Sequence, residues 1–185
     1  EEASRGGGLL FDLGPHLIDQ ALALFGAPQT VFATVRTHRD QASAPDYVHI
    51  QLGYGEFEVV LHASALTALA APRFTIHGTQ GSYVKYGLDT QEDQLKAGLR
   101  PGDEGFGAGN AAGVLRVLEG GQEVEREVPT RNGDYVGFYI ALADAIQNGV
   151  KFPVSAQDAV DVMTIIELAA RSSEDGVRLP FERIR

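Results

Sequence analysis

The sequence has no cysteine among its 185 residues. Disulfide bonds, thiolate nucleophiles and thiolate metal sites are therefore excluded. Basic charge is also scarce, because 15 Lys and Arg residues face 25 Asp and Glu residues and give a net charge of -10. Binding to nucleic acid needs Lys and Arg gathered on one surface, so nucleic acid is not an expected partner.

Long apolar runs are missing too. No stretch of about 18 apolar residues occurs, so we expect neither a membrane-spanning segment nor a membrane partner. Residues 1–5 contain no initiating Met and do not start a signal peptide, which indicates a cytoplasmic protein and a chain that begins inside a longer one. The composition is that of a globular protein, 44% hydrophobic and 22% charged, so residues 1–185 are expected to form a single domain.

The spacing of apolar residues predicts helices near both ends of the chain, over residues 10–25, 134–148 and 155–171. Alternation of apolar and polar residues predicts antiparallel strands between them, over residues 30–39, 46–54, 57–65, 73–77, 82–86, 114–119 and 123–128. This order predicts an α+β fold with an open, mostly antiparallel sheet of about six strands and helices packed on one face. The strand–helix alternation of a dinucleotide-binding Rossmann domain is missing from this chain.

The same patterns predict which faces are apolar. The first helix is expected to have Pro15 in its first turn or at a kink, and the last to begin with a capping-box-like signal over residues 155–158. The expected apolar faces are Leu10, Leu13, Leu17, Ala21 and Leu24 in the first helix, Val48, Ile50, Leu52 and Tyr54 in the strand over 46–54, and Val162, Ile165, Ile166 and Ala169 in the last helix.

Residues 6–19 carry the chemistry that we expect of the chain. Asp12 and His16 are four residues apart, and His16 and Asp19 three, so on a helix the three side chains share one face. Oxidation of an alcohol by a nicotinamide cofactor needs a base for the hydroxyl proton, and histidine suits this role near neutral pH. A neighbouring carboxylate can orient the ring or hold a second hydroxyl. The alternative is the solvated face of an ordinary amphipathic helix.

Two other patterns in the sequence favour structural interpretations. The glycine-rich residues 107–113 superficially match a dinucleotide fingerprint, but a polar loop precedes them and a strand-like segment follows, so we expect no cofactor-binding residue here. The whole stretch 87–113 is expected to be a flexible loop on the substrate side. Four histidines lie on the alternate faces of successive strands, and we expect an open sheet face there rather than a metal site; they are His38, His49, His62 and His77.

The helix over residues 134–148 carries an aromatic face. Tyr135, Phe138 and Tyr139 are most simply residues of the core. Because a buried phenol needs a polar partner, the hydroxyl of Tyr135 is also a candidate for a contact with substrate.

The pattern Gly-Gly-Gly-x-Leu-x-Asp-x-Gly-x-His-x-x-Asp over residues 6–19 resembles the start of the C-terminal domain of Gfo/Idh/MocA oxidoreductases. Three later stretches, residues 76–82, 135–149 and 153–159, are similar to further motifs of that family in the same order. The resemblance implies the substrate-binding and dimerisation half of a two-domain oxidoreductase. It also implies a Rossmann domain, outside this chain, as the partner that makes most of the contacts to NAD or NADP.

The same resemblance implies roles for individual residues. His16 is expected to accept, donate or relay the proton, and Asp12 to bind the substrate hydroxyl or orient His16. Asp19 and Tyr135 are expected to touch substrate or to support residues that do. Residues 82–89 are similar to a polyol-oxidising branch of the family, which favours a sugar, an inositol or another polyol as substrate.

Part of the family pattern is absent from this chain. The family's lysine in a Glu-Lys-Pro segment is missing, so we expect the chain alone to be inactive. A homodimer or higher homo-oligomer through the open sheet face is also implied. Two other functions stay open at this point: an NAD-dependent, redox-neutral glycosidase or lyase on the same scaffold, and a non-catalytic dimerisation domain.

Overall fold

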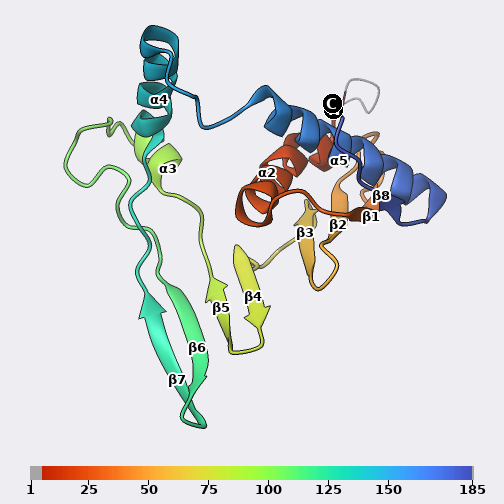
Figure 1. The fold of residues 1–185 in the computed structure, drawn as a ribbon, viewed down its shortest axis with the longest axis horizontal. Helices are drawn as coiled ribbons and strands as arrows, with labels where there is room; N and C mark the ends of the chain where they lie inside the picture. The colour runs from red at the N-terminus through yellow and green to blue at the C-terminus, as the bar shows by residue number, and fades with distance from the viewer. Residues whose placement is uncertain (1–5, 185) are drawn as a thin grey trace. The chain divides into compact units, whose positions relative to one another are not determined.

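The computed structural model describes residues 6–184, which divide into two compact units (Figure 1). The first unit runs up to Thr67 and resumes at Val154, and the second is Ala68–Pro153. Each unit has its own four-stranded antiparallel sheet. The α+β class is therefore confirmed, while the strands form two sheets in place of the single sheet of about six that we predicted. The assignment of residues 1–185 to one domain stays a prediction.

The first unit combines a sheet with helices from both ends of the chain. Its sheet has the strand order β3-β2-β1-β8. The strands are β1 (Thr30–Arg36), β2 (Tyr47–Gly53), β3 (Glu58–Ser64) and β8 (Leu179–Pro180), and the helices are α1 (Leu9–Asp12), α2 (Gly14–Phe25) and α5 (Ala156–Asp175).

The expected helix over residues 10–25 is interrupted once, at Leu13. Pro15 lies in the first turn of α2, where its missing N–H costs no helical hydrogen bond. Leu13 keeps right-handed helical angles, and its own N–H donates to Leu9 O at 2.9 Å while its carbonyl accepts from Leu17 N at 3.1 Å. The helical path therefore continues through the break. Gly26, with a φ of 76°, ends α2.

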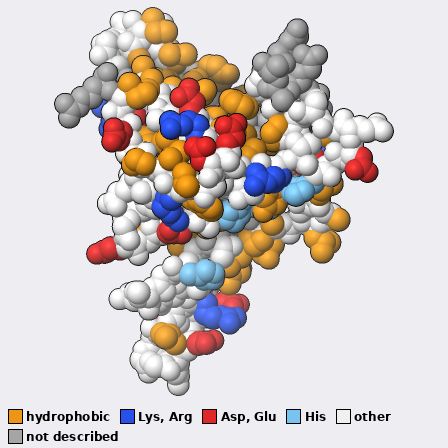
Figure 2. All heavy atoms as spheres, turned by 90° about the vertical axis from the view of Figure 1, so that its right-hand side faces the viewer, with side chains coloured by type: hydrophobic (Ala, Val, Ile, Leu, Met, Phe, Trp, Pro, Cys, Tyr) orange, Lys and Arg blue, Asp and Glu red, His pale blue; other side chains and the backbone are white. Residues whose placement is uncertain are grey.

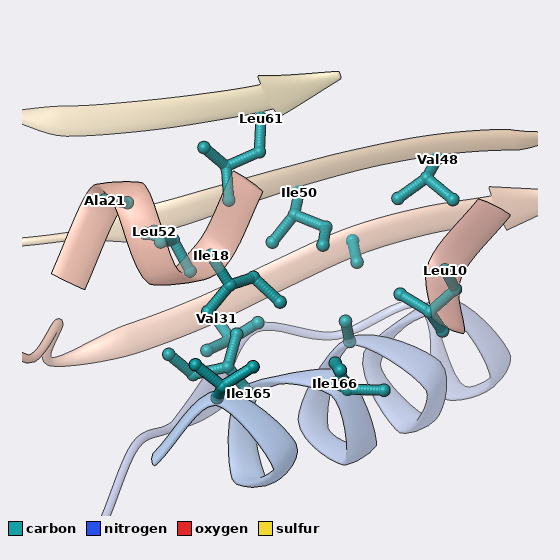
Figure 3. Packing of buried hydrophobic residues seen from close by; sticks show 13 residues of the cluster. Leu10, Ile18, Ala21, Val31, Val48, Ile50, Leu52, Leu61, Ile165 and Ile166 are labelled. Carbon is teal, nitrogen blue, oxygen red and sulfur yellow. The ribbon is translucent and has the colours of Figure 1, made fainter. Parts of the chain in front are cut away.

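The core of this unit lies between one face of the sheet and the helices (Figure 3). Val48, Ile50 and Leu52 of β2 are fully buried, as their alternation predicts. Ile165 and Ile166 of α5 are fully buried as well. The predicted faces of β2 and α5 are thus confirmed, and helices cover one face of this sheet. The predicted face of the first helix is partly wrong. Leu10 and Ala21 are buried as predicted, but Leu13 and Leu24 are exposed, and Ile18, which was not predicted, is fully buried.

Helix α5 also completes the open side of β1. Strand β8 pairs with β1 only at Thr30 and Val31, which leaves the next amides on that side without a partner strand. Ala33 N donates to Ser172 Oγ at 2.9 Å, and Val35 N donates to Ser173 Oγ at 2.8 Å. Two serine hydroxyls therefore satisfy backbone groups that would otherwise be left unpaired. At the other end of α5, Ser155 and Asp158 form the capping box that the sequence predicts.

The second unit contains the sheet β4-β5-β6-β7 and two helices. The strands are β4 (Phe74–Gly78), β5 (Gly81–Lys85), β6 (Gly113–Glu119) and β7 (Gln122–Val128), and the helices are α3 (Gln91–Lys96) and α4 (Tyr135–Asn148). No residue of α4 is buried. The expectation that Tyr135, Phe138 and Tyr139 belong to a core is therefore wrong for the second unit, where all three are exposed and Phe138 packs edge-on against Tyr139 and Phe152.

The segment 87–113 is not loop throughout, because it contains α3 and is crossed by hydrogen bonds, while its flexibility and its place on the substrate side stay predictions. Gln94, on α3, donates to the carbonyls of Gly105 and Ala108, and accepts from Gly107 N at 2.7 Å. Gly107 O in turn accepts from Gly133 N at 3.0 Å. A Cβ on Gly107 would lie 2.5 Å from Gly133 O, so only glycine fits there. Gly107 thus allows two backbone segments to pack closely against each other.

Candidate functional site

The helical path through α1 and α2 presents Asp12, His16 and Asp19 to solvent. All three are exposed, and the residues that anchor the path, Leu10 and Ile18, are buried on its other side. Within residues 6–184 no hydrogen bond or ion pair joins the three side chains to one another. The backbone carbonyl of His16 accepts from the Gln20 side chain at 2.8 Å. Because the path is helical across Leu13, Asp12 precedes His16 by about one turn.

Asp12 lines a pocket of about 520 Å³ that lies wholly within the first unit. Its floor and walls are the start of α1 and the loop of residues 39–45, which connects β1 to β2. The loop is tied to the helix because Leu9 N donates to Pro45 O at 2.8 Å. Gly8 fits beneath Pro45, since a Cβ there would lie 2.6 Å from Pro45 O, and its φ is 94°. Gly8, in the glycine motif of residues 6–8, therefore allows the loop to approach the start of α1 and Asp12 closely.

A buried carboxylate fixes the same loop. Asp46 has no exposed surface, and its side chain accepts from the backbone N–H groups of His38 at 2.8 Å and Arg39 at 3.0 Å. Arg39 Nε donates to the same carboxylate at 2.9 Å. The bond from His38 N, with the donors of Arg39, lowers the pKa of Asp46 from 3.8 to about 2 despite burial. The carboxylate is therefore ionised, and it holds one edge of the Arg39 guanidinium.

Sequence reasoning missed Arg39, Asp40 and Asp46 as parts of this region. Asp46 was expected only as the first residue of a strand. A single sequence does not show whether an aspartate side chain is buried or exposed. The only usable signal is its place after Pro45 and before a strand with strong alternation, which indicates a fixed strand start.

The predicted histidine face divides between the two units. His49 and His62 face each other across β2 and β3 with ring centroids 5.9 Å apart, and Tyr47 contacts both His62 and His38. His77 lies in the other sheet, where it is hydrogen-bonded to Ser82. Among residues 6–184 no three His, Asp or Glu residues are arranged to hold a metal ion. Tyr47, His49 and His62 instead form an aromatic row that covers the face of the first sheet opposite the helices.

Two remaining candidates lie in the second unit. Tyr135 is the first residue of α4, about half exposed, and its backbone N–H donates to the buried Gln91 side chain at 2.8 Å. The glycine-rich residues 107–113 lead into strand β6 and not into a helix. A pyrophosphate is bound at the N-terminus of a helix that follows such glycines, so this segment does not fit a dinucleotide.

The described surface carries mixed charge. On the face drawn in Figure 2, Lys and Arg side chains are scattered among acidic and apolar ones and form no continuous basic patch. No helix within residues 6–184 is long and apolar enough to cross a membrane.

Comparison with known proteins shows which family this chain is similar to. Residues 2–181 match the family model described as the oxidoreductase family, C-terminal alpha/beta domain. Among curated proteins, scyllo-inositol 2-dehydrogenase (NADP(+)) of Bacillus subtilis (strain 168) is 38% identical over 177 residues, 95% of this chain and 49% of that protein. The uncharacterized oxidoreductase YdgJ of Escherichia coli (strain K12) is 41% identical over 94% of this chain and 50% of its own length.

Solved structures give the same result. The YPO2259 protein of Yersinia pestis has a TM-score of 0.93 at 39% identity, covering 98% of this chain and 52% of that one. An oxidoreductase from Bacillus cereus has a TM-score of 0.88 at 33% identity, covering 98% of this chain and 54% of that one. This chain therefore spans about half the length of the relatives that it matches.

Proposed function

This chain belongs to the Gfo/Idh/MocA oxidoreductase family as its C-terminal alpha/beta domain, and from that premise we propose that it is the substrate-binding half of an NAD(P)-dependent polyol dehydrogenase. The proposed substrate is an inositol, a sugar or a related polyol. The relative named as a scyllo-inositol 2-dehydrogenase supports this class, since its match extends over 95% of the chain. The dinucleotide is assigned to the other half of the protein, because the glycine-rich segment here does not fit one.

The proposal gives each candidate residue a role in binding the substrate or in proton transfer. A nicotinamide held by the other half of the protein would supply the acceptor for the hydride that leaves the carbinol carbon of the substrate. His16 takes the hydroxyl proton, so that the C–H and O–H bonds are replaced by a C=O bond and charge is balanced. Asp12 accepts a hydrogen bond from a substrate hydroxyl or orients the imidazole. Asp19, one turn beyond His16, and Tyr135 are proposed as supporting residues.

The observation that carries the proposal is the position of Asp12 in a pocket of about 520 Å³, one helical turn before an exposed histidine. Pockets for small ligands usually measure about 300–1,000 Å³. The test uses the full-length protein with scyllo-inositol, other polyols and sugars, and follows NAD(P)H at 340 nm. Removing a positioned general base costs about 10²- to 10⁴-fold, so His16→Ala is expected to lower kcat by that amount.

A matched control is His77→Ala, which removes the same imidazole from an exposed strand position in the second unit and is expected to leave kcat within about twofold. An unchanged kcat/KM in His16→Ala would refute the role of His16. Consumption of substrate without net NAD(P)H would replace the dehydrogenase by a redox-neutral glycosidase or lyase. No consumption of any polyol or sugar would leave a non-catalytic dimerisation domain.

Association of two chains is also part of the proposal. The aromatic row on the open face of the first sheet, which contains Tyr47, His49 and His62, is proposed as the contact. Val60 lies on this face and is 53% exposed. We expect light scattering to give a dimer or higher oligomer for the full-length protein and a smaller species for Val60→Glu, because a charge at the centre of an apolar contact disfavours association.

A further inference from the structure

The loop of residues 39–45 offers hydrogen-bonding groups that the proposed proton transfer does not use. Arg39 is about half exposed, and only its Nε has a hydrogen-bond partner. Its two terminal nitrogens have none within residues 6–184. Asp40 is exposed and also lines the pocket. Together with Asp12, the pocket therefore has one guanidinium and two carboxylates at its walls.

The Arg39 side chain is held in place. The buried carboxylate of Asp46 anchors Nε, and the backbone N–H groups of His38 and Arg39 anchor the same carboxylate. A guanidinium is planar, so fixing Nε orients the plane in which the terminal N–H groups lie. A fixed donor loses less conformational entropy on binding than a free surface arginine does.

The combination of groups discriminates between classes of ligand. An anion would be attracted by Arg39 but repelled by Asp12 and Asp40, and a cation would meet the reverse arrangement. A polyol is uncharged, and each of its hydroxyls both donates and accepts. Vicinal hydroxyls can therefore accept from the guanidinium and donate to the carboxylates at the same time. Charge-assisted hydrogen bonds of this kind are the stronger class.

We propose that the 39–45 loop, closed against Asp12, is a polyol-binding subsite in which Arg39 donates to substrate hydroxyl oxygens while Asp12 and Asp40 accept from substrate hydroxyls. The assignment rests on the proposed function, since it places the polyol in the same pocket as Asp12. It makes Arg39 and Asp40 residues that determine specificity, and Asp46 the residue that positions Arg39.

The test measures binding and turnover separately in the full-length protein. Isothermal titration calorimetry in the presence of NADP⁺ gives the Kd of scyllo-inositol, myo-inositol and glucitol, and gluconate serves as the anionic comparison. Loss of a hydrogen bond to a charged donor weakens binding by about 10- to 100-fold, which is the expectation for Arg39→Ala. Asp40→Asn keeps an acceptor and loses the charge, so a loss of about 3- to 10-fold is expected.

Two controls separate this role from a structural one. Arg171→Ala removes the same charge from an exposed position on α5 that does not line the pocket, and it is expected to leave the Kd within about twofold. Arg39→Ala also removes a partner of Asp46, so its thermal midpoint is recorded. Asp40 has no partner within residues 6–184, and its variant should keep the wild-type midpoint.

The outcomes decide between the subsite and the catalytic proposal. Polyol binding that Arg39→Ala and Asp40→Asn weaken supports the subsite, even if no NADPH forms and the dehydrogenase assignment fails. Dehydrogenation with a Kd that neither variant changes overturns the subsite and leaves the dehydrogenase standing. The subsite is equally overturned if the wild-type protein binds none of the polyols, or if gluconate binds more tightly than its neutral counterparts.

Discussion

The serine pair on α5 gives the sharpest stability prediction. Ser172 is fully buried, and its hydroxyl accepts from Ala33 N at 2.9 Å and donates to Val177 O at 2.6 Å. Ser172→Ala leaves the buried Ala33 N–H without a partner, at about 1–3 kcal/mol, whereas the partly exposed Val177 carbonyl can bond to water instead. The higher helix propensity of alanine offsets about 0.5 kcal/mol of this loss in unfolding free energy. The expected net loss is about 0.5–2.5 kcal/mol of unfolding free energy.

Ser173→Ala is the matched control. The substitution is the same, one residue along the same helix, and Ser173 also accepts from a β1 amide, that of Val35. Its site is only partly buried, so water can replace the hydroxyl, and the expected loss is below about 1 kcal/mol. Urea unfolding of the full-length protein, followed by far-UV circular dichroism, gives both values. Amide exchange of residues 30–36 should accelerate more in Ser172→Ala.

The result that refutes this reasoning is equal stability of the two variants. It would mean that a water molecule enters beside Ala33 and accepts the hydrogen bond from its N–H, which requires space and at least two polar partners. Helix α5 would then not be needed to replace a missing partner strand at the most buried point of β1.

Two further predictions concern the loops. Because the folded-state pKa of Asp46 is about 2 against 3.8 in its ordinary state, its contribution to stability is complete above about pH 4 and is lost as pH falls towards 2. Asp46→Asn should therefore destabilise the protein at neutral pH and flatten the acid limb of the unfolding curve, and a limb that is unchanged would contradict this. Gly107→Ala should lower the thermal midpoint more than Gly109→Ala does, since both glycines have positive φ but only a Cβ at Gly107 would meet backbone, that of Gly133. Equal midpoints for the two variants would show that the close approach is not needed.

The features predicted well are those that a short stretch of sequence determines. The alternation of Val48, Ile50 and Leu52 specifies a buried face within one strand, and the capping box at Ser155 needs only four residues. The position of Pro15 follows in the same way from its missing N–H. The Asp12–His16 spacing also survives in the structure as a helical turn, although the roles of these residues stay predictions.

The features that were missed depend on contacts between distant segments. Strand β8 pairs with β1 about 150 positions away and has only two residues, which is too short for an alternating pattern to predict it. The grouping of strands into two sheets likewise depends on pairing, which alternation within each strand does not encode. The aromatic side of α4 looks like a core face because a helix pattern records hydrophobicity and not what covers it.

Asp46 shows how one missed residue links the fold to the proposed site. Burying an unpaired carboxylate is costly, so a buried aspartate persists only where donors surround it. Here all the donors come from His38 and Arg39, at the start of the loop that faces Asp12. The other end of that loop is fixed where Pro45 lies over Gly8, a position that only glycine can take. A loop fixed at both ends costs little to order when a ligand binds, so the interactions that stabilise this unit are also those that would prepare its pocket for a polyol.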